Sequence, residues 1–137
     1  MNVPNARPDL HRSQAPAWAL AGLLTVTGIT HFVLPTFYDA IIPTLLPGPV
    51  RAWTYASGVA ELACAAAVAH PSTRRFGATA AAILFVAVFP ANIKMAIDWR
   101  RRSAIEQAIA YGRLPLQIPL VIWATWVRRR TSVSRRG

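Results

Sequence analysis

Four polar side chains that can bind a ligand or carry a proton stand inside long apolar stretches of this sequence. Each falls in a different stretch: His31, Glu61, Asn92 and Gln117. An ionised side chain at the centre of a bilayer costs about 2.5–3.5 kcal/mol on insertion scales, so such residues are rare there and typically functional. The spacing therefore predicts a polar pocket assembled from several helices.

The residue types favour proton transfer and hydrogen bonding to an oxygen-bearing ligand. Glu61 and His31 can take up and release protons, which makes them the candidate catalytic residues. Asn92 and Gln117 can hold carbonyl oxygens, and Arg113, one helical turn before Gln117, adds a cation to the same zone. We predict that these three bind the ligand. The alternative is structural: the polar groups only fix the register of packed helices.

This set of residues is a poor ligand set for a metal ion. One histidine, one glutamate and two amides give poor zinc coordination, and no second histidine or cysteine stands near enough in sequence to complete a site. The single cysteine, Cys64, excludes an internal disulfide and is interpreted as a packing residue. We predict no metal, no haem and no covalently attached cofactor. A pocket with a few polar groups among apolar residues suits a lipophilic molecule better.

Four weakly charged stretches are expected to position these residues as membrane-spanning helices: 16–34, 52–69, 76–93 and 114–127. A helix of about 20 residues crosses a hydrocarbon core of about 30 Å. The last stretch is shorter and needs tilt or local thinning of the bilayer. A cleaved signal peptide is the alternative for the first, but its length and the absence of a cleavage pattern favour a retained anchor.

Two connecting segments complete the predicted fold. Residues 35–49 contain four prolines and one glycine, so we expect an interfacial segment rather than a span. Ser103 and Glu106 fit a capping box that starts a short amphipathic helix, which Gly112 can end. The prediction is an all-α, four-helix transmembrane bundle, with a polar tail at 1–15, a membrane domain at 16–127 and a basic tail at 128–137.

The charge pattern favours a membrane over nucleic acid as the partner. The chain is 54% hydrophobic and carries 15 Lys and Arg against 5 Asp and Glu. Its Lys and Arg residues cluster at the ends of the apolar stretches, nine on the side of the two termini against six on the other, which predicts cytoplasmic termini. We expect a multi-pass protein of a bacterial inner (plasma) membrane, with anionic headgroups beside the basic tail and no nucleic-acid partner.

Five fragments, in this order and spacing, resemble the DoxX-like family of small four-helix membrane proteins. The resemblance extends over about three quarters of the chain, from Gly28 to Trp126, and the fragments read GITHF at 28–32, IIP and LP at 41–43 and 46–47, SGVAEL at 57–62, FPANI at 89–93 and RLPLQ at 113–117. The resemblance implies a four-helix bundle. It also implies that the patterned positions coincide with the polar residues named above.

The resemblance implies a redox-linked function without fixing it. Relatives include a small subunit of a thiosulfate:quinone oxidoreductase and proteins associated with oxidative-stress complexes. We therefore expect a redox-linked or quinone-associated subunit, with other membrane or redox proteins as partners. Whether the chain is itself an enzyme stays open, because it has no cysteine pair. A non-catalytic scaffold or assembly factor is the alternative. A small multidrug exporter ranks last, because its membrane carboxylate lies in the first helix.

Overall fold

The computed structural model describes residues 14–133, and within that range the chain is built from helices and their connections alone. The prediction of an all-α protein is confirmed. In chain order the helices are α2 (Ala15–Val33), α3 (Pro35–Asp39), α4 (Val50–Ala69), α5 (Arg74–Ala87), α6 (Phe89–Asp98) and α7 (Ala104–Val133).

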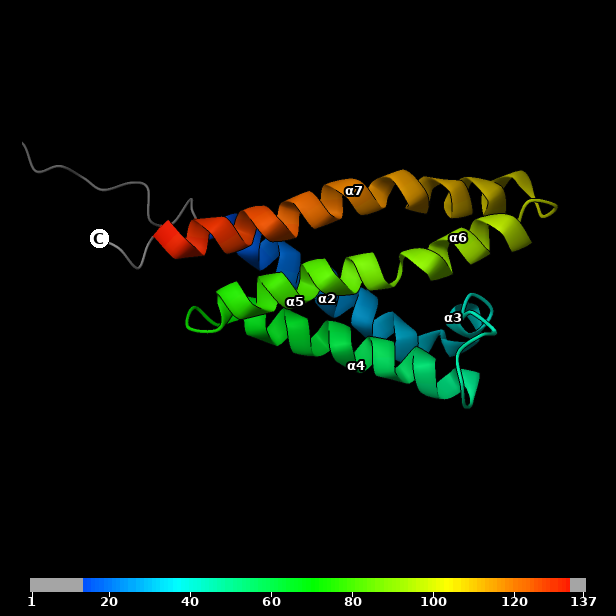
Figure 1. Ribbon diagram of the computed structural model, residues 1–137, viewed down its shortest axis with the longest axis horizontal. Helices are drawn as coiled ribbons and strands as arrows, with labels where there is room; N and C mark the ends of the chain where they lie inside the picture. Colours follow the sequence, from blue (N-terminus) through cyan, green and yellow to red (C-terminus); the bar gives the residue numbers. More distant parts are fainter. Residues whose placement is uncertain (1–13, 134–137) are drawn as a thin grey trace, which may run out of the picture.

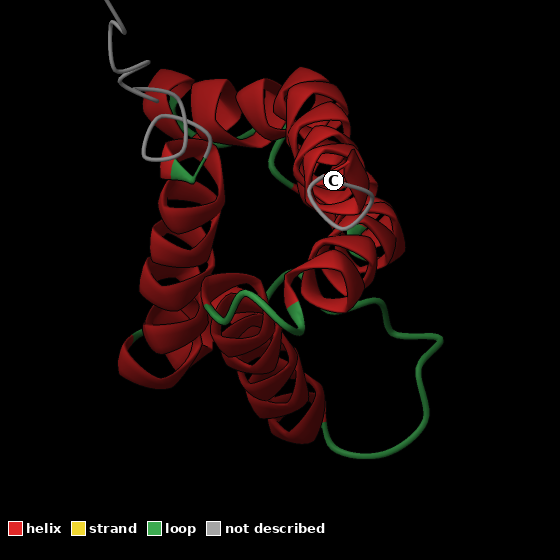
Figure 2. Ribbon diagram, turned by 90° about the vertical axis from the view of Figure 1, so that its left-hand side faces the viewer, coloured by secondary structure: helices red, strands yellow, loops and turns green. Residues whose placement is uncertain are grey.

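The long helices run side by side along one axis. α2 packs on α4, α4 packs on α5, and α7 lies along both α5 and α6, while α2 and α7 touch only briefly (Figure 1). Seen along the long axis, the helices surround a common centre (Figure 2). Four helical units, α2, α4, α5 with α6, and α7, therefore face one another, and the residues pointing inward from each can meet.

Two glycines allow α2 and α4 to cross at short distance. A Cβ atom added to Gly58 would lie 2.8 Å from His31 Cβ and 3.1 Å from the carbonyl oxygen of Gly28. Any larger residue there would push the helices apart, so small residues are needed at this kind of crossing. The contact brings the last turns of α2 against the middle of α4, where Glu61 is located.

The predicted third span is not one helix. α5 ends at Ala87 and α6 begins at Phe89, with Val88 forming the junction. Pro90 lies in the first turn of α6, where its missing N–H leaves no hydrogen bond unmade. The helical segment also continues past Ile93 to Asp98. The proline therefore starts a second helix instead of interrupting the end of the first.

The predicted short amphipathic helix and the predicted fourth span form one continuous helix, α7. The capping box is confirmed: Ser103 N donates to Glu106 Oε2 (3.1 Å), and Glu106 N donates to Ser103 Oγ (3.4 Å). Gly112 does not end the helix, because among the described glycines only Gly48 has a positive φ. Pro115 and Pro119 also lie inside α7, so this prediction was wrong.

Two segments are long and apolar enough to cross a membrane by length and composition, within residues 14–133: Ala15–Val33 and Arg74–Asp98. The predicted interfacial segment 35–49 contains α3 and turns. The predicted basic tail begins inside α7, which continues through Arg128–Arg130. Most of the predicted amino-terminal tail and the end of the basic tail lie outside the described residues.

Candidate functional site

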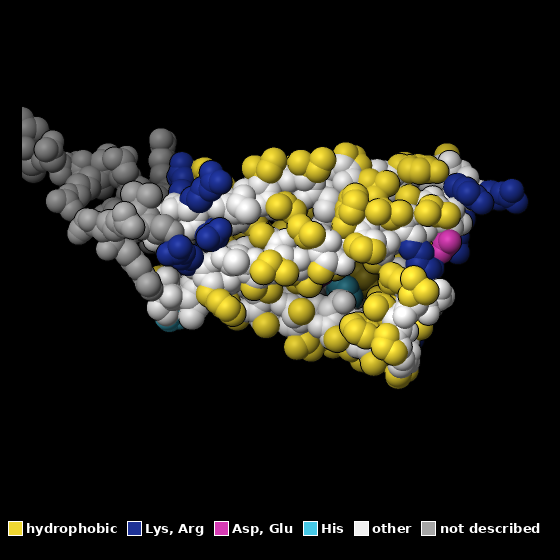
Figure 3. All heavy atoms as spheres, in the orientation of Figure 1, with side chains coloured by type: hydrophobic (Ala, Val, Ile, Leu, Met, Phe, Trp, Pro, Cys, Tyr) yellow, Lys and Arg dark blue, Asp and Glu magenta, His cyan; other side chains and the backbone are white. Residues whose placement is uncertain are grey.

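All five residues predicted from the sequence line one cavity of about 410 Å³. His31 comes from α2, Glu61 from α4, Asn92 from α6, and Arg113 and Gln117 from α7. Small-molecule sites typically occupy roughly 300–1,000 Å³. Figure 3 shows a hollow on one face, close to where α5 meets α6, with a histidine side chain inside it. Most other lining residues are apolar, including Leu23, Ile41, Ile42, Phe85, Leu116, Leu120 and Trp123.

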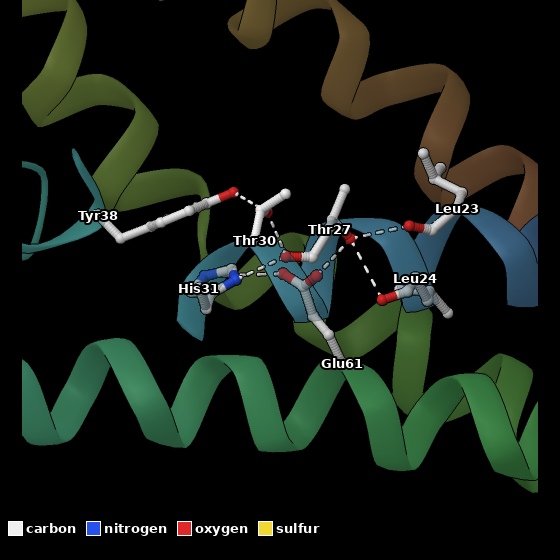
Figure 4. A network of polar contacts seen from close by, with 7 residues as sticks. All are labelled: Leu23, Leu24, Thr27, Thr30, His31, Tyr38 and Glu61. Carbon is white, nitrogen blue, oxygen red and sulfur yellow. Dashed lines mark hydrogen bonds and ion pairs between the residues drawn. The ribbon is translucent and has the colours of Figure 1, made fainter. Parts of the chain in front are cut away.

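Glu61 points into the bundle, where it meets Thr27 of α2 (Figure 4). Its side chain is 14% exposed. The Thr27 hydroxyl shares a hydrogen bond with Glu61 Oε2 and also lies 3.0 Å from the carbonyl oxygen of Leu23. A hydroxyl has one hydrogen. Either Thr27 donates to an ionised Glu61, or it donates to Leu23 and accepts from a protonated Glu61. The same atomic positions serve both states, which suits a proton carrier.

His31 is held in a fixed orientation beside this carboxyl group. Its Nδ1 lies 2.9 Å from the carbonyl oxygen of Thr27, which can only accept, so Nδ1 carries a hydrogen. The ring stacks on Tyr38 of α3 with centroids 3.7 Å apart and planes 23° apart. The Nε2 atom then faces Glu61 Oε1 at 4.0 Å. Backbone and aromatic contacts thus fix the tautomer and aim Nε2 toward Glu61.

A second polar chain crosses the bundle from α6 to α5. Asn92 Nδ2 donates to Gln117 Oε1 (2.9 Å), and Gln117 Nε2 donates to the carbonyl oxygen of Phe85. Phe85 lies in the last turn of α5, where carbonyls have no partner within the helix. Because a carbonyl can only accept, both amides have one orientation, and Asn92 Oδ1 remains as an acceptor.

Arg113 supplies a cation on the cavity wall. Its Nη1 donates to Met95 Sδ at 3.8 Å, and a thioether is a weak acceptor. Within residues 14–133, the carboxylates pair with other groups: Asp39 with Arg51, Asp98 with Lys94, Glu106 with Arg102, and Glu61 with Thr27 and His31. The guanidinium group therefore has hydrogens to offer to an oxygen of a ligand.

Sequence reasoning missed Thr27 and Tyr38. Thr27 precedes His31 by four residues, so the helical spacing that places both on one face could have indicated it. Tyr38 had no such signal. Nothing in the sequence of the proline-rich segment 35–49 shows that α3 lies against the cavity.

Asp39 ties α3 to α4 next to Tyr38. Its Oδ1 accepts from Thr54 Oγ1 (2.6 Å) and its Oδ2 accepts from Arg51 Nε (2.8 Å). The hydroxyl of Thr54, followed by the guanidinium of Arg51, lowers the pKa of the Asp39 carboxyl group below its ordinary value. These contacts fix α3 where its tyrosine stacks on the cavity histidine.

The family profile described as "Domain of unknown function (DUF8561)" matches residues 20–128, a range that contains all five predicted cavity residues. No curated protein and no solved structure matches this chain. Within the described residues, no three or more His, Cys, Asp or Glu side chains gather in a group that could hold a metal ion.

Proposed function

This chain belongs to the DUF8561 family, and we propose that it is a small integral membrane protein whose cavity binds a lipophilic molecule with polar oxygens, such as a quinone. One observation carries the proposal: five polar side chains from α2, α4, α6 and α7 line a single cavity with mostly apolar walls. In this role Glu61 and His31 carry protons. The amides of α6 and α7, with Arg113, hold the oxygens of the ligand.

Four membrane crossings, by α2, α4, α5 with α6, and α7, form part of this proposal. The apolar side chains on the surface support this part of the proposal. Val26, Phe76 and Ile118, on three different helices, are 62%, 74% and 65% exposed. On the face that Figure 3 shows, apolar side chains cover the middle of the molecule while Lys and Arg gather at its two ends. Soluble monomers rarely expose such large apolar areas, whereas this pattern is typical of a protein in a bilayer.

The proposed location is a bacterial inner (plasma) membrane with both termini in the cytoplasm. The single cysteine makes the orientation testable. In a Cys64→Ala background, Arg75→Cys and Arg101→Cys place one exposed thiol at each end of the bundle. We expect a membrane-impermeant maleimide to label Arg101→Cys in intact cells and Arg75→Cys only after lysis. Labelling in the reverse pattern would show the opposite topology. Labelling of both variants in intact cells would contradict a topology that places the two ends of the bundle on opposite sides of the membrane.

The order of the sequence motifs supports a DoxX-like bundle, so we also propose other membrane or redox proteins as partners. Ligand binding is tested first. The protein, purified in detergent, is extracted for bound lipophiles by mass spectrometry and titrated with a short-tailed quinone by calorimetry. We expect saturable binding that weakens about tenfold or more in Arg113→Ala and Gln117→Leu, which remove hydrogen-bond donors from the cavity wall. Val59→Ala, on the exposed face of α4, is the matched control. Unchanged binding in both cavity variants would show that the cavity is not the site.

A non-catalytic scaffold or assembly factor is the second candidate function. One observation favours it: within the described residues, every fully buried side-chain nitrogen or oxygen has a hydrogen-bond partner. A bundle that uses polar groups only to fix helix register would have the same property. Co-purification separates the two. A stable protein partner, with no small molecule bound and no quinone binding, would favour the scaffold.

A further inference from the structure

We infer that the ligand of this cavity carries a hydroxyl group, which binds between Nε2 of His31 and Oε1 of Glu61. The inference rests on the proposed function and narrows it, because it names the chemical class that the cavity selects: phenols and quinols rather than ethers and quinones.

The hydrogens that Thr30, Tyr38 and His31 Nδ1 donate all point away from the space between His31 Nε2 and Glu61 Oε1. Thr30 Oγ1 donates to the carbonyl oxygen of Thr27 (2.6 Å), which uses its one hydrogen. The hydroxyl of Tyr38, 2.6 Å from Thr30 Oγ1, must therefore be the donor in that contact. His31 Nδ1 donates to the same Thr27 carbonyl. In a neutral ring the remaining nitrogen, Nε2, is then an acceptor.

Glu61 presents a second acceptor to the same gap. Its Oε2 is engaged with Thr27, which leaves Oε1 facing His31 Nε2 at 4.0 Å. This distance is too long for a hydrogen bond. A charge-assisted bond between an imidazolium and a carboxylate would close to about 2.7–2.9 Å. Two acceptors kept apart, both on the cavity wall, leave a position that an oxygen about 2.8 Å from each would fit.

Only an oxygen that brings a hydrogen is stabilised between two acceptors. A hydroxyl donates its hydrogen to Nε2 or to Oε1, whereas a carbonyl or ether oxygen would meet lone pairs on both sides. Across the cavity, the Asn92 and Gln117 amide nitrogens each keep a second hydrogen, and Arg113 donates to Met95 Sδ without an ion pair among residues 14–133. An apolar ring with one hydroxyl group and a second oxygen for Arg113 therefore matches the groups on these walls.

Matched probes test the inference without redox chemistry. A long-chain 4-alkylphenol and its methyl ether share ring and tail and differ in the one hydrogen. We expect the phenol to bind the purified protein about tenfold more tightly or better, because the ether leaves buried acceptors without a donor. A short-tailed quinol should likewise bind more tightly than the quinone with the same tail.

Two variants test whether the preference for the phenol over the ether arises at His31 and Glu61. His31→Phe keeps the stacking on Tyr38 and removes Nε2, and Glu61→Gln places an amide in the gap. Each should reduce the preference for the phenol to about twofold or less. Leu120→Ala, on the apolar wall, should weaken both probes equally and keep the preference. Circular dichroism and thermal unfolding confirm that each variant is folded.

The outcomes separate this inference from the proposed function. Equal binding of phenol and ether to the unmodified protein, with quinone also bound, would overturn the inference and leave the proposed function standing. A preference that persists in both His31→Phe and Glu61→Gln would place the hydroxyl elsewhere and also overturn it. Failure of all four probes to bind would remove the proposed function, and the inference with it.

Discussion

The crossing of α2 and α4 at Gly58 gives the sharpest test of how the site is held together. In Gly58→Ala the new Cβ atom would lie 2.7 Å from Phe32 Cε2, 2.8 Å from His31 Cβ and 3.1 Å from the carbonyl oxygen of Gly28. The phenyl ring can rotate away. The other two atoms belong to or adjoin the backbone of α2, so α2 itself has to move.

The size of the effect follows from these distances. Ordinary contact begins at 3.4 Å, so the spacing to His31 Cβ must grow by at least about 0.6 Å. Overpacking of this kind costs about 1–3 kcal/mol, while replacing a helical glycine by alanine favours the helix by roughly 0.5–1 kcal/mol. We expect a net loss of about 1–2 kcal/mol in unfolding free energy. Displacement of α2 should also lengthen the Thr27–Glu61 contact and weaken ligand binding.

Thermal and denaturant unfolding in detergent, combined with calorimetric binding, measure both effects. Gly22→Ala is the matched control, because a Cβ atom added to Gly22 of α2 meets nothing within 4 Å. This variant should be as stable as the unmodified protein or slightly more stable. If Gly58→Ala unfolds at the same point as Gly22→Ala and binds ligand equally well, the close crossing described here is wrong.

Three further substitutions probe the polar contacts. Gln117→Leu should cost about 1–3 kcal/mol for each group left unpaired, the Phe85 carbonyl among them, as measured by denaturant unfolding. Arg74→Ala should destabilise by about 1.5–3 kcal/mol per lost bond, because the buried Arg74 donates to two carbonyls at the end of α4 (2.8 and 3.0 Å), and exposed Arg75→Ala should change little. The lowered pKa of Asp39 means that its ionised form stabilises the fold above the unfolded-state pKa of about 3.9. That contribution is lost as the pH falls through the folded-state pKa. The unfolding temperature of Asp39→Asn should therefore fall less steeply in acid than that of the unmodified protein. An equally steep fall would contradict a stabilising role of the ionised Asp39.

The five cavity residues could be predicted because ionisable and amide side chains are rare inside long apolar stretches. A glutamate in the middle of α4 or an amide in α6 is expensive wherever it faces acyl chains, so its presence in the sequence already indicates a polar neighbour. The sequence did not show which residue that polar neighbour would be. Glu61 contacts Thr27, a residue common in helices, and His31 lies against Tyr38, whose position depends on how the proline-rich segment folds.

The helix boundaries were harder to predict because glycine and proline break helices only when the surroundings allow it. Gly112 keeps a helical backbone since nothing requires a positive φ there, and the packing of α7 along α5 and α6 holds the helix past Pro115 and Pro119. Pro90, by contrast, falls where a new helix can begin. The same residue types therefore have different effects, and local sequence does not distinguish them.

The break between α5 and α6 and the turn before His31 share one physical consequence. Each provides the polar side chains with a backbone carbonyl, that of Phe85 or that of Thr27, and a carbonyl can only accept. A nitrogen that reaches it must donate, which fixes the orientation of the Gln117 amide and the tautomer of His31, and leaves His31 Nε2 as an acceptor facing Glu61. The hydrogen-bonding character of the site is therefore set by backbone geometry as much as by side-chain identity, which is why the residue list alone points to a pocket and the structure points to a hydroxyl-bearing ligand.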